Sequence, residues 1–237
     1  MNNNNKIRRK LLSPPGDTIQ ETIDTLGMNQ YELAERLGKN IKNVNRIIKG
    51  KESITTDTAI SLEKVLGISA DFWLERERLY RKELAEIEFD EQLEKNKNWV
   101  NNFPVSEMEK LNWIPKSASM TEKAKALLTF FGIASPAQWN KIYESKKIAV
   151  AFRISLKNTS NPYSISAWLR QGELQAKRPG IKTYNKDIFK NSLSEIKKLS
   201  YEHPRDFLSK LQNICNQSGV ALVFTPNISN ATISGAS

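Results

Sequence analysis

Four closely spaced glycines restrict the fold of the N-terminal third of this chain more than any other feature. Gly27, Gly38, Gly50 and Gly67 each follow a run in which apolar residues recur every three or four positions. That period marks one face of an α-helix, and glycine readily ends a helix. A fifth helix begins near Ser69 and is expected to continue, with charged residues, to about residue 98. Short helices joined by short turns predict a compact all-α domain of about 60 residues.

Polar residues that can cap a helix stand just before these runs. The breaker cluster Ser13–Gly16 is followed by Asp17 and Thr18, and either of them suits the N-cap of the first helix. The N-cap candidates of the next three helices are Asn29, Asn40 and Thr55 or Thr56. Each of these helices therefore has a predicted start as well as a predicted end.

The rest of the chain is expected to form three further parts. Residues 1–13 are polar and Asn-rich and predict a disordered arm, whereas the all-α domain occupies residues 14–80. Residues 81–118 predict a charged helical linker, and within it residues 99–118, which contain two tryptophans and two prolines, predict a hinge. Residues 119–237 are expected to form a second domain.

The second domain is predicted to be α+β, which makes the whole protein mainly α with one smaller sheet. Lys147–Ile154 alternates weakly between apolar and polar residues, and the apolar run Gly219–Phe224 is typical of a buried strand. Helical periodicity covers Thr121–Phe131, Pro136–Tyr143, Ala167–Gln175, Lys186–Tyr201 and Pro204–Gln217.

Composition excludes several classes of protein. The single cysteine, Cys215, cannot form an intrachain disulfide, and the single histidine, His203, excludes a zinc site that needs two histidines. No stretch approaches the ~18–20 consecutive apolar residues of a membrane span, and the N-terminus lacks the apolar segment of a secretory signal. We therefore expect a cytoplasmic protein that is not an enzyme and has no metal, cofactor or membrane span.

The net charge of +10 is spread unevenly. Residues 1–80 carry a net charge of +2, residues 81–115 carry −3 and residues 116–237 carry +11. A basic balance attracts nucleic acid through the release of counterions, but this attraction ignores sequence. The local order of residues, rather than the total charge, must therefore locate a DNA site.

The segment Asn29–Gly50 has the residue pattern of a helix-turn-helix. Ala34 is small where the second helix must pack closely against the first, and Gly38 permits a tight turn between them. Val44 and Ile47 are expected to anchor the second helix in the core. The other face of that helix is then free to enter the major groove of DNA.

That free face is rich in basic and amide side chains. From Lys39 through Lys51 there are five basic residues and no acidic one. Lysine and arginine bind phosphate or guanine, and asparagine binds adenine. Gln30, at the start of the first helix, is placed to bind a phosphate. The predicted DNA-binding residues are Gln30, Lys39, Asn40, Lys42, Asn43, Asn45, Arg46 and Lys49.

A dimer contact is expected at Phe72, Trp73 and Leu74. Three large apolar residues in a row cannot all face one small core, so they predict a role shared between the core and a partner. A single helix-turn-helix reads only a few base pairs, and specific repressors of this kind pair over two half-sites. The expected partners are a second copy of this chain and double-stranded operator DNA.

Residues 14–80 resemble the lambda-repressor-like (XRE/Cro-type) helix-turn-helix, and in particular its HigA-type plasmid-maintenance antitoxin branch. The resemblance implies a dimeric operator binder that commonly represses its own promoter and often has a small toxin protein as a partner. The matching residues are Pro15-Gly16, Gln30, Leu33–Gly38, Ile47–Gly50, Ile54-Thr55, Ala59, Leu62, Leu66-Gly67 and Phe72–Leu74.

The region after residue 118 is similar, over fewer residues, to the segment that precedes the catalytic core in ImmA/IrrE-type metallopeptidase fusions. The similar segments are Ile148–Arg153, Ala167–Glu173 and Gly219–Phe224. In that family a zinc-binding His-Glu-x-x-His helix follows. This sequence has no such motif, and His203 alone cannot form the pair of histidine ligands, so hydrolysis is not expected.

Three hypotheses about function therefore stay open. The first is a homodimeric, sequence-specific DNA-binding regulator whose second domain modulates it. The second is a non-catalytic or split portion of a metal-dependent peptidase regulator. The third is an antitoxin that acts mainly by binding a toxin protein.

Overall fold

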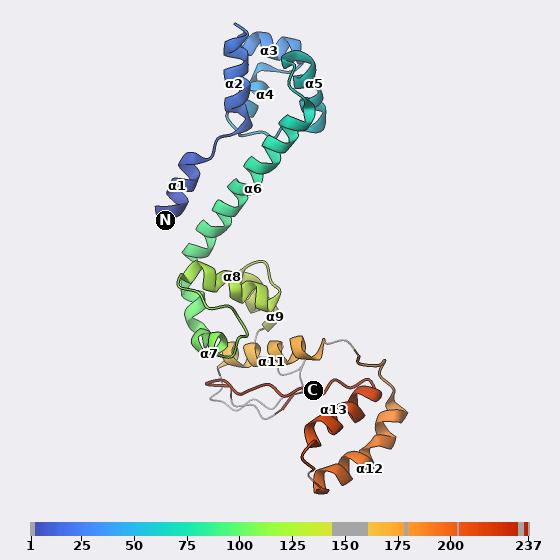
Figure 1. Ribbon diagram of the computed structural model, residues 1–237. Coiled ribbons are helices and arrows are strands. Elements are labelled where there is room, and N and C mark those ends of the chain that lie inside the picture. Colours follow the sequence, from blue (N-terminus) through green and yellow to red (C-terminus); the bar gives the residue numbers. More distant parts are fainter. Residues whose placement is uncertain (1–2, 144–160, 178–179, 203, 232–234, 237) are drawn as a thin grey trace. The chain divides into compact units, whose positions relative to one another are not determined.

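The chain divides into two compact units, unit 1 (Met1–Lys95) and unit 2 (Asn96–Ser237). Each unit has its own buried residues. A computed structural model describes residues 3–143, 161–177, 180–202, 204–231 and 235–236 (Figure 1).

Helices make up all the regular secondary structure described in unit 1. They are α1 (Asn3–Leu11), α2 (Pro15–Thr25), α3 (Gln30–Arg36), α4 (Ile41–Ile48), α5 (Thr56–Leu66) and α6 (Ala70–Lys95). The five helices from α2 onward are those that the sequence predicted. The capping side chains of Asn29, Asn40 and Thr55 accept hydrogen bonds from the backbone of α3, α4 and α5, as expected.

The start of α2 differs from the prediction. The helix begins at Pro15, with Pro14 at the N-cap, whereas Asp17 lies inside the first turn. Proline suits the first position of a helix because the N–H that it lacks would have no partner there. The cap predicted at Asp17 or Thr18 is therefore wrong.

The core of unit 1 is mainly aliphatic. Trp73 is its one aromatic ring, is wholly buried, and donates from its indole Nε1 to the carbonyl oxygen of Ile68 at 3.1 Å. The other large, fully buried members are Ile19, Ile23, Leu33, Val44 and Leu62. This core contains residues from α2, α3, α4, α5 and α6, so the buried faces of α3 and α4 pack against the other three helices.

One glycine sets the closeness of α2 and α4. A Cβ atom on Gly16 would lie 1.9 Å from the carbonyl oxygen of Ile48, at the end of α4. A real Cβ cannot approach a backbone atom so closely, so only glycine allows this contact. The C-terminal end of α4 is thereby held against the first turn of α2.

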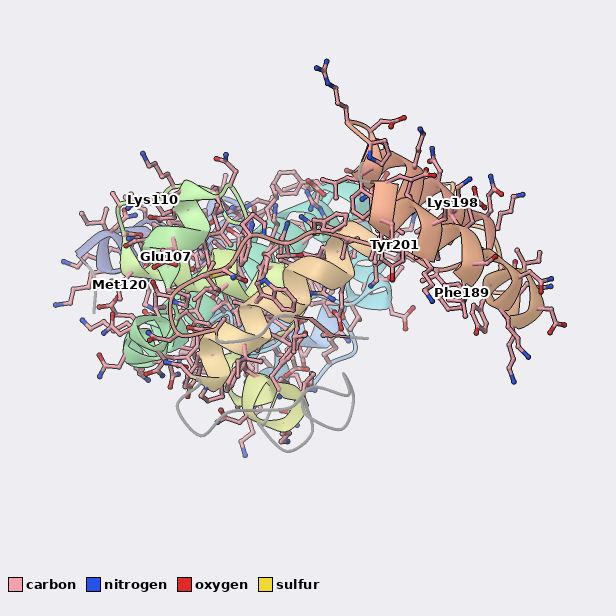
Figure 2. The ribbon with its side chains drawn as sticks, turned by 90° about the horizontal axis from the view of Figure 1, so that it is seen from below. Glu107, Lys110, Met120, Phe189, Lys198 and Tyr201 are labelled. Carbon is pink, nitrogen blue, oxygen red and sulfur yellow. The ribbon has the colours of Figure 1, made fainter. Side chains whose placement is uncertain are left out.

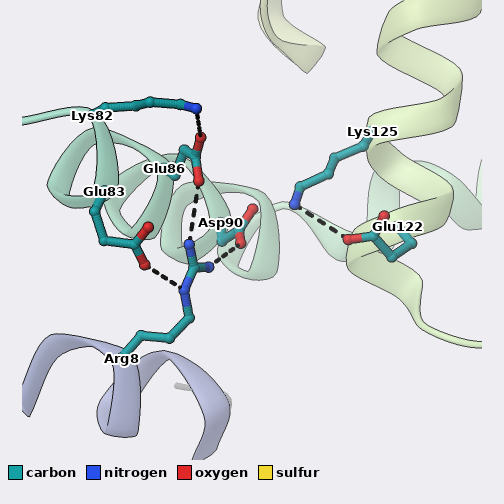
Figure 3. A network of polar contacts seen from close by, with 7 residues as sticks. All are labelled: Arg8, Lys82, Glu83, Glu86, Asp90, Glu122 and Lys125. Carbon is teal, nitrogen blue, oxygen red and sulfur yellow. Dashed lines mark hydrogen bonds and ion pairs between the residues drawn. The ribbon is translucent and has the colours of Figure 1, made fainter. Parts of the chain in front are cut away.

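The arm that was predicted to be disordered contains α1, which docks on α6. Arg8 pairs with Glu83, Glu86 and Asp90 at 2.8, 3.4 and 3.2 Å (Figure 3). The hydrogen bond to Glu83 is the main cause that raises the pKa of Arg8. The composition of residues 1–13 suggested disorder. The basic helix α1 instead pairs with the acidic face of α6, and a pattern within residues 1–13 cannot reveal this distant partner.

Unit 2 is also helical in its described residues. Its elements are the 3₁₀ helix η1 (Lys97–Asn102), α7 (Val105–Lys110), α8 (Met120–Phe131), α9 (Pro136–Tyr143), α11 (Pro162–Ala176), α12 (Lys186–Glu202) and α13 (Phe207–Gln217). The predicted helices in this part of the chain agree with these bounds to within a few residues. Much of α12 is exposed, including Lys198 and Tyr201 (Figure 2).

An aromatic cluster around Phe103 organises the first half of unit 2. The Phe103 ring lies edge-on to Trp99, Trp139 and Tyr163, with centroids 4.8, 5.6 and 5.0 Å away. Trp139 stacks on Tyr163 at 4.2 Å. Aromatic pairs in these geometries add about 0.5–1.5 kcal/mol each to the burial of their area.

The predicted sheet is absent from the residues that the structure describes, so the α+β assignment of the second domain is wrong. Residues 219–224 were expected to be a buried strand, but Gly219 lies in a turn with a φ of 79° and residues 220–224 have no regular secondary structure. None of these six residues is fully buried. The carbonyl oxygens of Leu222 and Thr225 accept from the side chains of Gln212 and Trp168 at 3.1 and 3.2 Å. Helix side chains satisfy this backbone in place of a neighbouring strand, and local hydrophobicity cannot distinguish the two arrangements.

Several expectations fall on residues that lie outside the described part of the chain. These are the weak alternation at 147–154, the peptidase-like segment at 148–153, and His203. Among the described residues, no group of three or more His, Cys, Asp or Glu side chains could hold a metal ion. None of the helices found in those residues is both long and apolar enough to cross a membrane.

Candidate DNA-binding site

The turn between α3 and α4 is built on Gly38. Its φ of 61° lies in the left-handed region, which glycine adopts readily. Its N–H donates to the carbonyl oxygen of Glu35 at 3.0 Å, and the N–H of Lys39 donates to that of Ala34 at 2.9 Å. These bonds close α3 and turn the chain sharply into α4.

Helix α4 has two chemically distinct faces. Val44, Ile47 and Ile48 are buried in the core of unit 1. The opposite face exposes three cations and one amide: Lys42, Arg46, Lys49 and Asn43. A hollow of about 760 Å³ opens on this side, and it is lined by Ile41, Lys42, Asn43, Asn45, Arg46, Lys49, Lys51 and Glu52. The apolar residues, three or four positions apart in this eight-residue helix, therefore determine which polar side chains face outward.

The C-terminal end of α4 is closed by a backbone motif around Gly50. Gly50, with a φ of 66°, donates its N–H to Ile47, and Lys51 donates to the carbonyl oxygen of Arg46 at 2.8 Å. This is the Schellman arrangement, which returns the chain toward the last turn of the helix. It brings Glu52 beside Arg46, where the Arg46 Nε donates to Glu52 Oε2 at 3.1 Å.

A chain of amide side chains links α4 to α3 and α2. Asn45 donates to Gln30 at 3.2 Å, Gln30 donates to Gln20 at 2.6 Å, and Gln20 donates to Asp24 at 2.7 Å. This chain orients Asn45 at the edge of the hollow. It also gives Gln30 a structural role beside the phosphate contact that the sequence predicted.

The predicted DNA-binding residues thus fall into distinct positions. Lys42, Asn43 and Arg46 are exposed on α4, and Lys49 is exposed at its C-cap. Asn40 caps α4 by accepting from the N–H of Lys42 at 2.8 Å, and Lys39 is half-buried in the turn. Sequence reasoning missed Gln20 and Glu52. The position of Gly50 offered a signal for Glu52, since the residues after a Schellman glycine return to the helix end.

The three residues expected at a dimer contact lie in different environments. Trp73 is wholly buried in the core of unit 1, and Leu74 is partly buried against that core. Phe72 is 40% exposed, with its ring edge-on to Trp73 at 5.2 Å. Among these three residues, Phe72 offers the most surface to a partner.

A short helix, a tight glycine turn and a second helix with a basic exposed face define a helix-turn-helix DNA-binding domain. Comparison with known proteins agrees: the sequence profile described as helix-turn-helix matches residues 19–73. That match spans α2 to the first turn of α6, which is the part of unit 1 that carries the core and the turn.

Two curated relatives extend this result. The uncharacterized HTH-type transcriptional regulator YddM of Escherichia coli K12 is 35% identical over 74 residues, which are 31% of this chain and 77% of that protein. Virulence-associated protein I of Dichelobacter nodosus is 30% identical over 73 residues, which are 30% of this chain and 68% of that protein. The chain therefore belongs to the helix-turn-helix family of transcriptional regulators.

The chain is also similar to solved structures. One of them is an addiction module antidote protein of a HigA family from Coxiella burnetii, with 32% sequence identity over 35% of this chain and 92% of that chain, and a TM-score of 0.33. The family assignment rests on the profile and on the curated relatives. All these matches cover little more than a third of the chain at most.

Proposed function

We propose that this protein is a sequence-specific regulator that reads operator DNA with α4. The observation that carries the proposal is the division of α4 into a buried apolar face and an exposed face that has basic and amide side chains and no acid. The major groove of B-DNA is about 12 Å wide and accepts one α-helix. Because the apolar face of α4 is packed in the core, the helix can present its exposed face to the groove without rearrangement.

Each exposed side chain then has a distinct role. Lys42 and Lys49 neutralise phosphates as point charges, which sets affinity and register rather than sequence preference. Arg46 donates to the O6 and N7 atoms of guanine, and Asn43 and Asn45 hydrogen-bond to adenine. Asn45 is oriented by the amide chain through Gln30 and Gln20.

The same proposal includes a homodimer on two half-sites. Phe72 and Leu79 lie seven residues apart on α6, so they share one face of that helix, and both are exposed. A second copy of this chain that covers this face would place two α4 helices on one duplex. Half-sites would then be about one helical turn apart.

The direct test is to enrich random duplexes on the purified full-length protein and to sequence them. We expect an inverted repeat, which the wild-type protein binds in a gel shift. Recovery of no common sequence, or binding to all duplexes with equal affinity, would remove operator recognition from the proposal.

Nothing in the described residues favours the other two hypotheses over this one. Toxin binding rests on the resemblance to HigA-type antitoxins, and no surface described above indicates it. The peptidase-like interpretation included a strand at 219–224, which is not formed. DNA binding is therefore the function that the geometry supports best.

A further inference from the structure

Glu52 lines the hollow beside α4, directly after the basic run Lys39–Lys51. DNA presents a dense array of negative phosphates, so a carboxylate in this position opposes the binding of any duplex. An acid at this position therefore lowers the affinity for DNA. The contact that Glu52 makes with Arg46 indicates a role other than affinity.

The backbone holds Glu52 next to Arg46. The N–H groups of Lys51 and Glu52 both donate to the carbonyl oxygen of Arg46, at 2.8 and 3.2 Å. Gly50 permits this return of the chain because its φ of 66° lies in the left-handed region that glycine adopts readily. The hydrogen-bonded turn therefore places the backbone of Glu52 beside that of Arg46, within reach of the ion pair between their side chains.

The contact engages one particular edge of the guanidinium group. Arg46 Nε donates to Glu52 Oε2 at 3.1 Å, whereas the described residues show no hydrogen bond or ion pair from its two terminal Nη nitrogens. Those two nitrogens are the donors that bind guanine O6 and N7 in parallel. Glu52 thus restrains the guanidinium plane and leaves its base-reading edge free.

We propose that Glu52 is a positioning residue that sets the preference of Arg46 for guanine, an inference that rests on the proposed DNA-binding function. Glu52 restricts the rotamers of a long side chain before DNA is bound, so less freedom is lost when the parallel pair forms. The duplex recognised is one with a guanine at the Arg46 position of each half-site.

Two substitutions separate positioning from charge. Glu52→Gln removes the charge but retains an oxygen that can accept from Arg46 Nε, whereas Glu52→Ala removes both. Glu21→Ala is the matched control, since it removes an exposed acid from α2, away from the hollow. Random duplexes are enriched on each full-length variant, and affinity for the selected site and for single-base variants is measured by gel shift, with folding checked by thermal unfolding.

We expect Glu52→Ala to bind all duplexes more tightly but to lose roughly 10-fold of the discrimination at one guanine per half-site. This should be the position that Arg46→Ala also affects. Glu52→Gln should keep the guanine preference, and Glu21→Ala should match the wild type. A Glu52→Ala protein that gains affinity and keeps its guanine preference would overturn the positioning role and leave Glu52 as a source of repulsion only. Failure of the wild-type protein to select any sequence would instead contradict the proposed function itself.

Discussion

The two units of this protein are both helical, but different side chains hold them together. Unit 1 packs aliphatic residues around a single buried tryptophan, whereas the first half of unit 2 packs rings around Phe103. Four glycines with positive φ end or join the helices of unit 1, so the length of each helix is set locally. In unit 2 two carbonyl oxygens of the irregular residues 220–225 accept hydrogen bonds from side chains of α11 and α13.

The unit with the larger net positive charge is not the unit proposed to read DNA. Residues 116–237 carry a net charge of +11, yet the face proposed to read DNA lies in unit 1, where residues 1–80 carry only +2. Specific recognition depends on where cations and amides stand on one rigid helix, and total charge supplies only a sequence-independent attraction. Under the proposed function, the positions of cations and amides on α4 therefore matter more for recognition than the net charge of either unit.

The largest expected effect on stability comes from comparing two adjacent residues of α6, the buried Trp73 and the exposed Phe72. Trp73→Ala should destabilise unit 1 by about 3–5 kcal/mol, because it leaves a cavity in the core. Phe72→Ala should change stability by less than about 1 kcal/mol but should weaken self-association. Urea unfolding measures the first effect, and sedimentation of the full-length protein measures the second. Equal self-association of wild type and Phe72→Ala would remove Phe72 from the proposed dimer contact.

Substituting alanine for one helical glycine in each unit should change stability in opposite directions. Gly16→Ala should destabilise unit 1 by about 3 kcal/mol, since its Cβ would collide with the backbone of Ile48. Gly172→Ala in α11 should stabilise unit 2 by about 0.5–1 kcal/mol, because its Cβ would meet only side-chain atoms at 3.6 Å or more. Thermal unfolding of both variants checks the pair. A stable Gly16→Ala protein would show that α2 and α4 can separate at little cost.

A third comparison measures how the loss of one cation from each unit changes DNA binding. Arg46→Ala and Lys42→Ala should each lower affinity for the selected operator by about 1–3 kcal/mol or relax its sequence, without unfolding the protein. Lys190→Ala, which removes an exposed cation from α12, should leave the preferred sequence unchanged. Gel shifts at several salt concentrations distinguish phosphate contacts from base contacts. If neither α4 variant changes affinity or site preference, α4 is not the recognition helix.

The smallest expected effect concerns one carboxylate in each unit. Hydrogen bonds from the hydroxyl and N–H of Ser229 hold the pKa of Glu107 below its usual value, and the N–H of Ala70 does the same to the pKa of Glu63. Both contacts should persist at pH values above the usual carboxyl pKa and weaken as pH falls through the lowered one. An NMR titration of the two carboxyl carbons measures both midpoints, and Glu107→Gln should abolish the response of the Ser229 amide. A midpoint at the usual glutamate value would contradict the hydrogen bonds.

The sequence predicted α3, α4 and α5 well because each follows a capping side chain and is followed by a glycine. Asn29 and Asn40 cap the two helices of the motif, and Gly38 supplies the turn between them. The exposed face of α4 followed from the positions of its buried residues. That face was predicted as a set of cations and amides, and whether these residues bind DNA stays a prediction.

What the sequence did not predict depends on contacts between distant segments. The docking of α1 requires carboxylates more than seventy residues away, such as Glu83. Residues 219–224 have the composition of a strand, but strand formation needs a neighbour that these residues do not find in the described part of the chain. The contact between Glu52 and Arg46 depends on the return of the backbone at Gly50, which the helical period does not show.

The docking of α1 also limits how α6 can change length during evolution. Arg8 meets three carboxylates, at 83, 86 and 90, because spacings of three and four place them on one side of the helix. Inserting a single residue just before Glu83 would rotate all three by about 100° about the helix axis and carry them away from Arg8. A seven-residue insertion would leave them only about 20° out of phase, although it would move them along the axis by about 10 Å. Insertions and deletions in this stretch therefore conserve the contact only if α1 or the connection after it changes at the same time.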